Sequence, residues 1–339
     1  MSKRHEKGLI ITAIFAILLS THLYITFYGP AGRDDTLKTI EVKRGASFGQ
    51  VAERLSSAGI IASKTRFLFA ARTMGAYTKT KAGVYALSAN MSPVTIIGML
   101  KRGEVKQYTI TVPEGYTIRD IGGLLESSGL VAGEDFITSA ADKGLADELG
   151  LPGPTLEGYL FPDTYRLHKG MSAREIISVM AERFKEVYSK ELKRLARKKG
   201  LNMNKAVTLA SIIEKETNAP SERPIISSVF HNRLKKGIRL QSDPTVIYAM
   251  RAFFNGNIRK KDLKIKSPYN TYINYGLPPG PIANPGRDAI MAAVSPADSK
   301  YLYFVSKNDG THYFSSSYRE HVNAVNRYQK RPRRRAKKR

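Results

Sequence analysis

The sequence predicts an α+β protein with one N-terminal membrane helix, a repeated α/β region and a mixed α+β domain. Three observations support this fold class. An uncharged apolar run lies near the N-terminus, a pattern of strand, glycine turn and helix occurs twice in the first half, and amphipathic helix patterns alternate with glycine- and proline-rich loops in the second half. At 339 residues with 42% hydrophobic content, the chain is long enough for two compact domains.

The apolar run covers residues 8–28 and contains no Asp, Glu, Lys or Arg. A helix of this length, at ~1.5 Å per residue, crosses a hydrocarbon layer of ~30 Å, so we expect a transmembrane helix. A cleavable signal peptide is the alternative, but the run is long for one and residues 29–32 form a poor cleavage site. Three basic residues and one acidic residue precede the run. The positive-inside rule therefore predicts a cytoplasmic tail at residues 1–7 and an exported remainder.

The chain carries a formal net charge of +26, and residues 330–339 alone supply eight positive charges and no negative ones. Basic exported surfaces usually meet anionic lipid headgroups or anionic wall polymers, whereas nucleic acid is the usual partner of proteins in its own compartment. We therefore expect no nucleic-acid partner. Residues 329–339 are expected to form a flexible electrostatic tether or a solubilising run.

Composition excludes several chemistries. The chain has no cysteine, which rules out disulfides, thiolate zinc sites and cysteine nucleophiles. Its six histidines show no zinc-binding spacing, and neither a phosphate-loop glycine pattern nor a nucleophile elbow occurs. We therefore expect neither a metal ion nor another cofactor.

A repeat occupies the first half of the chain. Residues 42–48, Val-Lys-Arg-Gly-Ala-Ser-Phe, are echoed by residues 112–118, Val-Pro-Glu-Gly-Tyr-Thr-Ile. Each copy reads as a strand, a glycine turn and a helix capped by Ser47 or Thr117. The pattern resembles LysM-like modules, whose known relatives bind glycans that contain N-acetylglucosamine; the alternative is a spacer that lifts the following domain off the membrane. We expect this region to span residues 36–150.

The sequence pattern changes near residue 151, where prolines and glycines interrupt the helix and strand patterns. We expect a mixed α+β domain at residues 151–328. One long helix is predicted from a capping box at Ser172 to a stop at Gly200. The remaining predicted elements are helices at 205–217 and 221–236, a polar turn at 239–245, a hairpin at 301–315 and a last helix from 318.

A buried helix that ends in carboxylates is the strongest candidate for chemistry. The predicted helix at 205–217 begins as an almost wholly apolar run and ends in Glu-Lys-Glu-Thr. Desolvation raises the pKa of a carboxyl at the mouth of an apolar wall, and the helix C-terminus acts in the same direction. Both Glu214 and Glu216 continue an apolar stripe, so periodicity does not choose between them. The alternative is a solvated helix end in which the glutamates pair with Arg223.

Four segments of the second half resemble a known family. Residues 210–217, 239–245, 269–272 and 276–280 read Ala-Ser-Ile-Ile-Glu-Lys-Glu-Thr, Arg-Leu-Gln-Ser-Asp-Pro-Thr, Tyr-Asn-Thr-Tyr and Gly-Leu-Pro-Pro-Gly. Together they resemble the endolytic murein transglycosylase family, also called YceG-like, and the similarity covers nearly the whole exported chain. The resemblance implies a YceG-like catalytic domain and a peptidoglycan lytic transglycosylase, a lyase. It places the catalytic acid at Glu216, with Glu214 as a nearby support or a second candidate.

In the implied reaction, the C6 hydroxyl of N-acetylmuramic acid attacks its own C1, and the bond to N-acetylglucosamine breaks without water. One carboxyl suffices, because the group that protonates the leaving oxygen can then accept the proton of the C6 hydroxyl. Asp243 and Asp163 are further candidates, since a negative charge would stabilise an oxocarbenium-like transition state. The alternative for both is a turn-forming role.

Loops rich in amide, hydroxyl and aromatic groups suit a carbohydrate ligand, because such groups stack on sugar faces and bind hydroxyls and acetamides. The alternative is that they only fix the geometry of the loops. The expected substrate contacts are Gln241, Ser242, Thr245, Tyr269 and Asn270.

The resemblance also implies partners and a location. The expected substrate is nascent peptidoglycan glycan strands, cut on the outer face of the inner (plasma) membrane so that elongation ends, beside peptidoglycan synthases. Three alternatives remain open: a non-catalytic wall-binding scaffold, a hydrolase of the same fold that leaves reducing ends, and a nucleic-acid-binding protein that uses the basic tail.

Overall fold

The structure, a computed structural model of the 339-residue chain, describes residues 3–78 and 80–329. The predicted tail at 329–339 therefore lies outside the described residues, except for its first position. The fold is a mixture of helices and short strands, as the predicted α+β class requires. The chain divides into two compact units: the first comprises Met1–Thr109, Gly129–Val131 and Arg166–Ser172, and the second comprises Ile110–Ser128, Ala132–Tyr165 and Ala173–Arg339.

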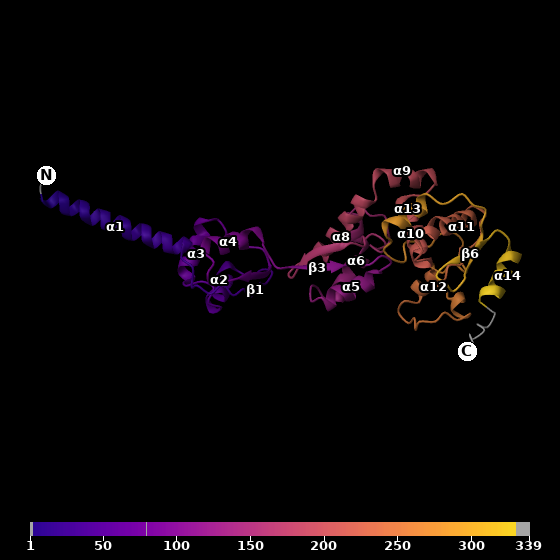
Figure 1. Ribbon diagram of the computed structural model, residues 1–339, viewed down its shortest axis with the longest axis horizontal. Coiled ribbons are helices and arrows are strands. Elements are labelled where there is room, and N and C mark those ends of the chain that lie inside the picture. The colour runs from indigo at the N-terminus through magenta and orange to yellow at the C-terminus, as the bar shows by residue number, and fades with distance from the viewer. Residues whose placement is uncertain (1–2, 79, 330–339) are drawn as a thin grey trace, which may run out of the picture. The chain divides into compact units, whose positions relative to one another are not determined.

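Helix α1 (Lys3–Tyr28) is the long N-terminal helix, drawn in indigo in Figure 1. Its segment Lys7–Tyr28 is long and apolar enough to cross a membrane, and its most apolar stretch is not buried by the rest of the protein. Exposed Leu and Ile side chains are unfavourable in water and favourable in lipid. The helix therefore fits a single-pass membrane anchor.

The first unit buries one apolar cluster between a two-stranded sheet and its helices. Strands β1 (Lys38–Val42) and β2 (Gly83–Leu87) pair antiparallel. Helices α2 (Phe48–Ser57), α3 (Lys64–Thr73) and α4 (Pro93–Arg102) complete the unit. The largest side chains of the cluster that are fully buried are Leu55, Ile60, Phe67, Tyr85, Leu87, Ile96 and Ile97.

The two sequence repeats fold alike at the start of their helices. The Ser47 hydroxyl accepts the Gln50 N–H, and the Gln50 side chain accepts the Ser47 N–H in return. Helix α5 (Ile118–Ser127) begins after Thr117, which forms the same reciprocal capping box with Asp120. The predicted capped helix is therefore confirmed in both repeats.

Helix α10 (Met203–Glu216) is the central helix of the second unit, and it is buried from Ala206 to Glu214. It packs against α13 (Arg287–Val294) and α11 (Arg223–Lys235), its neighbours in Figure 1. The remaining elements of this part of the chain are β3 (Gln107–Thr111), α6 (Gly133–Ala141), α7 (Lys143–Glu148), β4 (Thr164–His168), the 3₁₀ turns Pro220–Glu222 and Asp262–Lys264, and α12 (Asp243–Ala249). β3 and β4 form a two-stranded sheet.

The long helix predicted from Ser172 to Gly200 is in fact two helices, α8 (Ala173–Val187) and α9 (Lys190–Lys198). The break occurs because Ser189 adopts an extended backbone and its hydroxyl accepts the Leu192 N–H, so it caps a new helix. The apolar spacing continues across the break, since Tyr188, Leu192 and Ala196 are all buried. Periodicity alone therefore could not reveal it.

Two other predicted boundaries also differ from the structure. The predicted helix at 221–236 is a 3₁₀ turn, Pro220–Glu222, followed by α11, because Pro224 fits best in the first turn of an α-helix. The predicted polar turn at 239–245 does not reach residue 245. Its Ser-Asp-Pro sequence instead begins α12, with Asp243 in the first turn.

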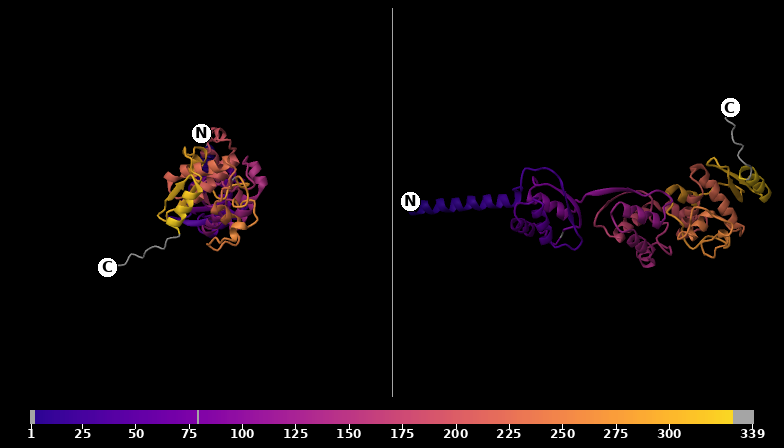
Figure 2. Two further views of the ribbon diagram at one scale, coloured as in Figure 1. Left: turned by 90° about the vertical axis from the view of Figure 1, so that its right-hand side faces the viewer. Right: turned by 90° about the horizontal axis from the view of Figure 1, so that it is seen from below.

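The predicted hairpin and last helix are confirmed. Strands β5 (Tyr303–Ser306) and β6 (His312–Ser315) pair antiparallel. Helix α14 (Tyr318–Tyr328) is capped by Ser317 and packs against both strands. Figure 2 shows this helix and the hairpin together in yellow. They form one wall of the site described next.

Candidate active site

The two glutamates at the end of α10 meet different neighbours, because positions two apart on a helix differ by ~200° in direction. Glu214 Oε1 accepts a hydrogen bond from Arg223 Nη2 at 2.8 Å, and its Oε2 accepts the Gly286 N–H at 3.0 Å. Glu114 accepts from the same Nη2 at 3.3 Å. Glu214 does pair with Arg223, but inside the protein, so the solvated helix end is wrong for this residue. Glu214 fixes the end of α10 to α11 and to the start of α13.

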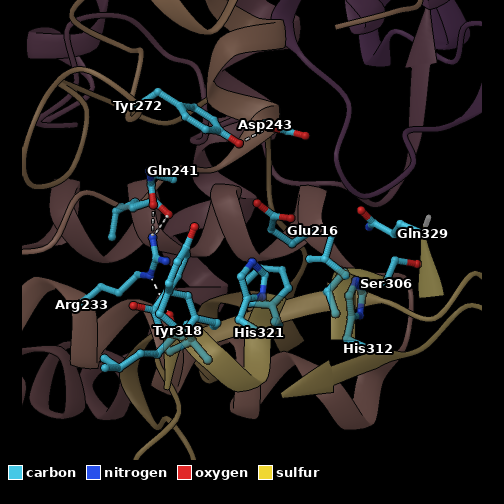
Figure 3. A pocket seen from close by; sticks show the side chains of 17 residues that line it. Glu216, Arg233, Gln241, Asp243, Tyr272, Ser306, His312, Tyr318, His321 and Gln329 are labelled. Carbon is cyan, nitrogen blue, oxygen red and sulfur yellow. Dashed lines mark hydrogen bonds between the residues drawn. The ribbon is translucent and has the colours of Figure 1, made fainter. Parts of the chain in front are cut away.

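Glu216 lies in a pocket of about 480 Å³ (Figure 3). The pocket is lined by α11, by the loop before α12, by the β5–β6 hairpin and by α14. Its polar lining includes Glu216, Arg233, Gln241, Asp243, Tyr272, His312, Tyr318 and His321. Its aliphatic lining is Val229, Leu240, Leu302, Val305 and Val325. The pocket therefore combines ionisable side chains, Glu216 among them, with hydrogen-bonding groups and an apolar wall.

Glu216 is half-buried, and its Oε1 accepts a hydrogen bond from the Ser242 hydroxyl at 2.5 Å. Burial raises the pKa of Glu216 to about 7, the hydrogen bond from Ser242 opposes this rise, and the negative charge of Asp243 adds to it. A carboxyl with a pKa near 7 is protonated in about half of the molecules at neutral pH. It is therefore suited to give a proton and to take one back.

Asp243 lines the same pocket from the first turn of α12. Its Oδ1 accepts the Tyr272 hydroxyl at 2.5 Å, as the dashed line in Figure 3 shows. This bond orients the carboxylate beside Glu216. The other carboxylate candidate, Asp163, pairs with Arg183 at 2.7 Å and does not line the pocket.

The five predicted substrate contacts do not all lie at the pocket. Gln241 lines the pocket, and Ser242 is buried against Glu216. Thr245 and Asn270 are both 0% exposed. The Thr245 hydroxyl donates to the Ser242 carbonyl at 2.7 Å, and Asn270 donates to the carbonyls of its own loop.

Tyr269 is half-buried and packs on the ring of Tyr248, with 4.9 Å between centroids. Neither ring lines the Glu216 pocket. The structure thus brings Gln241 and Ser242 to Glu216, and it leaves Thr245, Tyr269 and Asn270 in the scaffold that shapes the loops. The surroundings of these three residues fit the alternative role, in which they fix the geometry of the loops and do not contact the substrate.

The sequence model of the YceG-like family matches residues 40–327. The chain belongs to the YceG-like family. An endolytic murein transglycosylase of Bacillus subtilis (strain 168) is 34% identical to this YceG-like chain, over 88% of the chain and 87% of the relative. One of Streptococcus pneumoniae serotype 2 is 29% identical, over 84% of this chain and 57% of the longer relative.

The fold of this YceG-like chain also matches a solved structure. A crystal structure of a yceG-like protein from Listeria monocytogenes superposes with a TM-score of 0.58 and 32% sequence identity. The match covers 85% of this chain and 98% of that one.

Several pocket residues of this YceG-like chain were not predicted from its sequence. His312 is held by Glu222, whose Oε1 accepts the His312 N–H at 2.9 Å and whose Oε2 lies 2.7 Å from Nδ1. His321 of α14 stacks on Tyr303, with 5.1 Å between centroids. These residues follow Glu216 in sequence by far more than a helix length, and no local pattern marks them.

A second carboxyl was also missed. Glu157 is 4% exposed, and burial raises its pKa to about 8. Its Oε1 accepts the Ile118 N–H at 3.0 Å and Asn284 Nδ2 at 3.2 Å. It does not line the Glu216 pocket, so it organises the scaffold. Among the described residues, no group of three or more His, Asp or Glu side chains is arranged to hold a metal ion.

Proposed function

We propose that this chain is an endolytic lytic transglycosylase, which cleaves the bond between N-acetylmuramic acid and N-acetylglucosamine in peptidoglycan strands without water. The observation that carries the proposal is Glu216, a carboxyl with a pKa of about 7 inside a pocket lined by hydrogen-bonding groups. The names of the relatives from Bacillus subtilis and Streptococcus pneumoniae support the same substrate.

Glu216 supplies both proton transfers. In its protonated form it donates a proton to the glycosidic oxygen, and the bond from that oxygen to C1 breaks. The resulting carboxylate accepts the proton of the C6 hydroxyl while that oxygen bonds to C1, which gives a 1,6-anhydro end and regenerates the acid. No water is consumed, and one carboxyl serves both steps.

The neighbours of Glu216 have supporting roles in this mechanism. The Ser242 hydroxyl holds Glu216 in one orientation, and Tyr272 does the same for Asp243. The negative charge of Asp243 stabilises the positive charge that develops on the sugar ring. Glu214 supports Glu216 by fixing the last turn of α10 through Arg223.

A hydrolase is the second candidate function, because Asp243 offers a second carboxylate in the same pocket. Mass spectrometry of glycan strands digested by the full-length protein in detergent separates the two functions, since an anhydro product lacks one water. We expect anhydro ends from the wild type and none from Glu216→Gln. Glu134→Gln, which changes an exposed carboxylate of α6, is the matched control and should cleave normally.

Either of two other results would displace this proposal. Reducing ends from the wild type would assign a hydrolase. Absence of cleavage by a folded wild type would favour the wall-binding scaffold.

The repeats are proposed to be LysM-like modules that hold glycan strands. Corresponding positions of the two copies line surface hollows of about 440 and 580 Å³. The first hollow is lined by Gly45, Ala46 and Gln50 among others, and the second by Gly115, Tyr116 and Asp120. By sequence, residues 36–150 are the proposed repeat region and residues 151–328 the proposed catalytic domain; in the structure, residues 110–128 of the second repeat belong to the compact unit that holds the Glu216 pocket.

The proposed location follows from the anchor and the substrate. Helix α1 would hold the chain in the inner membrane with its N-terminus in the cytoplasm, which places the Glu216 pocket on the outer face, where peptidoglycan lies. Cleavage of nascent strands there would terminate their elongation. Peptidoglycan synthases are the proposed partners, because they produce those strands.

A further inference from the structure

Arg233 was not a predicted site residue, yet its side chain is fixed in the wall of the Glu216 pocket. It is 7% exposed, and its Nε donates to the Leu302 carbonyl at 2.7 Å. Nη1 donates to the carbonyls of Arg239 at 2.7 Å and Leu240 at 3.0 Å, and to Gln241 Oε1 at 3.0 Å. The guanidinium carbon lies 5.1 Å from the centre of the Tyr303 ring. A guanidinium held by this many contacts has one orientation.

This orientation decides which way the Gln241 amide points. An amide group can turn over and exchange its oxygen and nitrogen, so its direction follows from its partners. Arg233 can only donate hydrogen bonds, and it therefore requires the oxygen of Gln241. The Gln241 NH₂ group then points the other way. No residue that the structure describes accepts a hydrogen bond from it, and Gln241 is an exposed residue that lines the pocket.

The backbone of Gln241 is also held in an unusual conformation. Its φ is +54°, in the left-handed region that glycine adopts more easily than any other residue. The Gln241 N–H donates to the Thr271 carbonyl at 3.1 Å, which secures this conformation. A non-glycine residue in this region costs conformational free energy, and such residues concentrate at functional sites. Figure 3 shows Gln241 above Arg233, joined to it by a dashed line.

We infer that Gln241, oriented by Arg233, recognises the carbonyl oxygen of an N-acetyl group on the bound glycan. An NH₂ group is a donor that requires an acceptor oxygen. The aliphatic lining of the same pocket, which includes Leu240 and Leu302, offers a surface for the acetyl methyl group. A hydroxyl group would use the donor but not this surface. Gln241 is then a specificity residue, and Arg233 is a positioning residue.

This inference rests on the proposed function for its substrate, but it is tested by binding and not by cleavage. The full-length chain in detergent, carrying Glu216→Gln, is titrated by calorimetry with three preparations of soluble glycan strands: fully N-acetylated, N-deacetylated, and deacetylated then re-acetylated. The acetyl preference is the ratio of Kd for deacetylated strands to Kd for acetylated strands. Re-acetylated strands should bind like the original ones.

Gln241→Met keeps the length of the side chain and removes the donor, and Gln241→Gly also relieves the left-handed backbone. Each should lower the acetyl preference by about 3- to 10-fold, the effect of one neutral hydrogen bond. Gln241→Gly should do so with an unchanged or higher melting temperature, which a merely structural role would not allow. Gln107→Met, an exposed change in β3, is the matched control and should keep the full preference.

Arg233→Lys retains a positive charge but cannot form the same fork of hydrogen bonds. Arg233→Lys protein that still melts cooperatively, and is therefore folded, should show a lower acetyl preference. Gln241→Met and Gln241→Gly proteins that keep the wild-type preference would overturn the inference, even if the wild type makes anhydro ends. A wild type that makes no anhydro ends, while its acetyl preference still depends on Gln241, would overturn the proposed function and leave this inference standing.

Discussion

Glu216 and Glu157 are two carboxyls of the second unit whose pKa values burial raises, and their surroundings give them different roles. Glu216 is half-buried in an open pocket, where a substrate oxygen can reach it. Glu157 is enclosed, and its oxygens are already engaged by Ile118, Tyr248 and Asn284. A shifted carboxyl with access can exchange protons with a ligand, whereas one without access can only influence stability.

The pH dependence of cleavage should change when either of two neighbours of Glu216 is removed, because Asp243 raises the pKa of Glu216 and Ser242 lowers it. Because the acid must be protonated to start the reaction, kcat/KM should fall as the pH rises above about 7. Asp243→Asn removes a charge that raises the pKa of Glu216, so this fall should move to lower pH. Ser242→Ala removes a hydrogen bond that lowers it, so the fall should move to higher pH.

The measurement is the rate of formation of anhydro ends from pH 5 to pH 9 for the wild type and both variants. The midpoint of the fall reports the pKa even where a variant is slower overall. Three coincident midpoints would show that another group limits the rate.

Glu157 should make the folded state less stable as the pH rises. Its pKa is raised from 4.5 to about 8 in the folded state, so the folded state binds the proton more tightly than the unfolded state does. The stabilisation from this proton is complete below about pH 4.5 and is lost as the pH rises through about 8. Glu157→Gln should therefore raise the melting temperature relative to the wild type at pH 8.5, by several degrees, and less at pH 5.

Thermal melts by circular dichroism at the two pH values measure this difference, with Glu134→Gln as the exposed control. An equal effect of Glu157→Gln at both pH values would mean that Glu157 does not change its protonation between them.

At this scale, part of the site could be predicted from the sequence. The apolar run followed by Glu-Lys-Glu-Thr located the end of α10, but both glutamates continue the same apolar stripe. What separates them is the residue that each one meets, Arg223 for Glu214 and Ser242 for Glu216. These neighbours depend on tertiary packing, and only the family resemblance distinguished Glu216 in advance.

At the scale of secondary structure, the site depends on where helices begin and end. Capping patterns predicted the starts of α2 and α5 correctly, because a cap is a local contact between residues three apart. The break between α8 and α9 was missed, since the buried positions continue their helical spacing across Ser189. The hairpin and α14 were predicted as elements, but their packing against the Glu216 pocket was not, because no local pattern encodes it.

The end of α10 is held by an ion pair between elements, and its removal should be costly. Arg223→Met leaves the buried carboxylate of Glu214 without its partner, which typically costs about 3–5 kcal/mol. The double variant Arg223→Met with Glu214→Met should recover much of this loss, because no buried charge remains. Arg183→Met is the matched control: it removes two exposed ion pairs and should cost less than about 1 kcal/mol.

Urea unfolding of the four proteins gives the free energies, and cleavage assays then report whether Glu216 keeps its place. A loss for Arg223→Met no larger than that for Arg183→Met would contradict the stabilising role of the buried pair.

At the scale of the whole molecule, the chain combines an N-terminal helix that fits a single-pass membrane anchor with a YceG-like region that the family model matches from residue 40 to residue 327. A helix able to cross a membrane could be predicted, because length and composition decide this property, whereas a retained anchor and a cleavable signal peptide share the same apolar pattern. The direction of insertion is a separate matter that the flanking charges govern. It also determines whether the Glu216 pocket can reach peptidoglycan at all.

Membrane topology is therefore the prediction on which the proposed function depends at this scale. With three basic residues and one acidic residue before the apolar run, we expect the C-terminus on the outer face of the membrane. Alkaline phosphatase fused after residue 339 should be active, because this enzyme folds only outside the cytoplasm. A green fluorescent protein fused at the same position should be dark, because it would be exported. Replacing Lys3, Arg4 and Lys7 by glutamate should reduce phosphatase activity, since it removes the charges that keep the N-terminus inside. An inactive phosphatase on a stable wild-type fusion would put the pocket in the cytoplasm, away from the glycan strands, and the proposed cleavage of peptidoglycan would then fail.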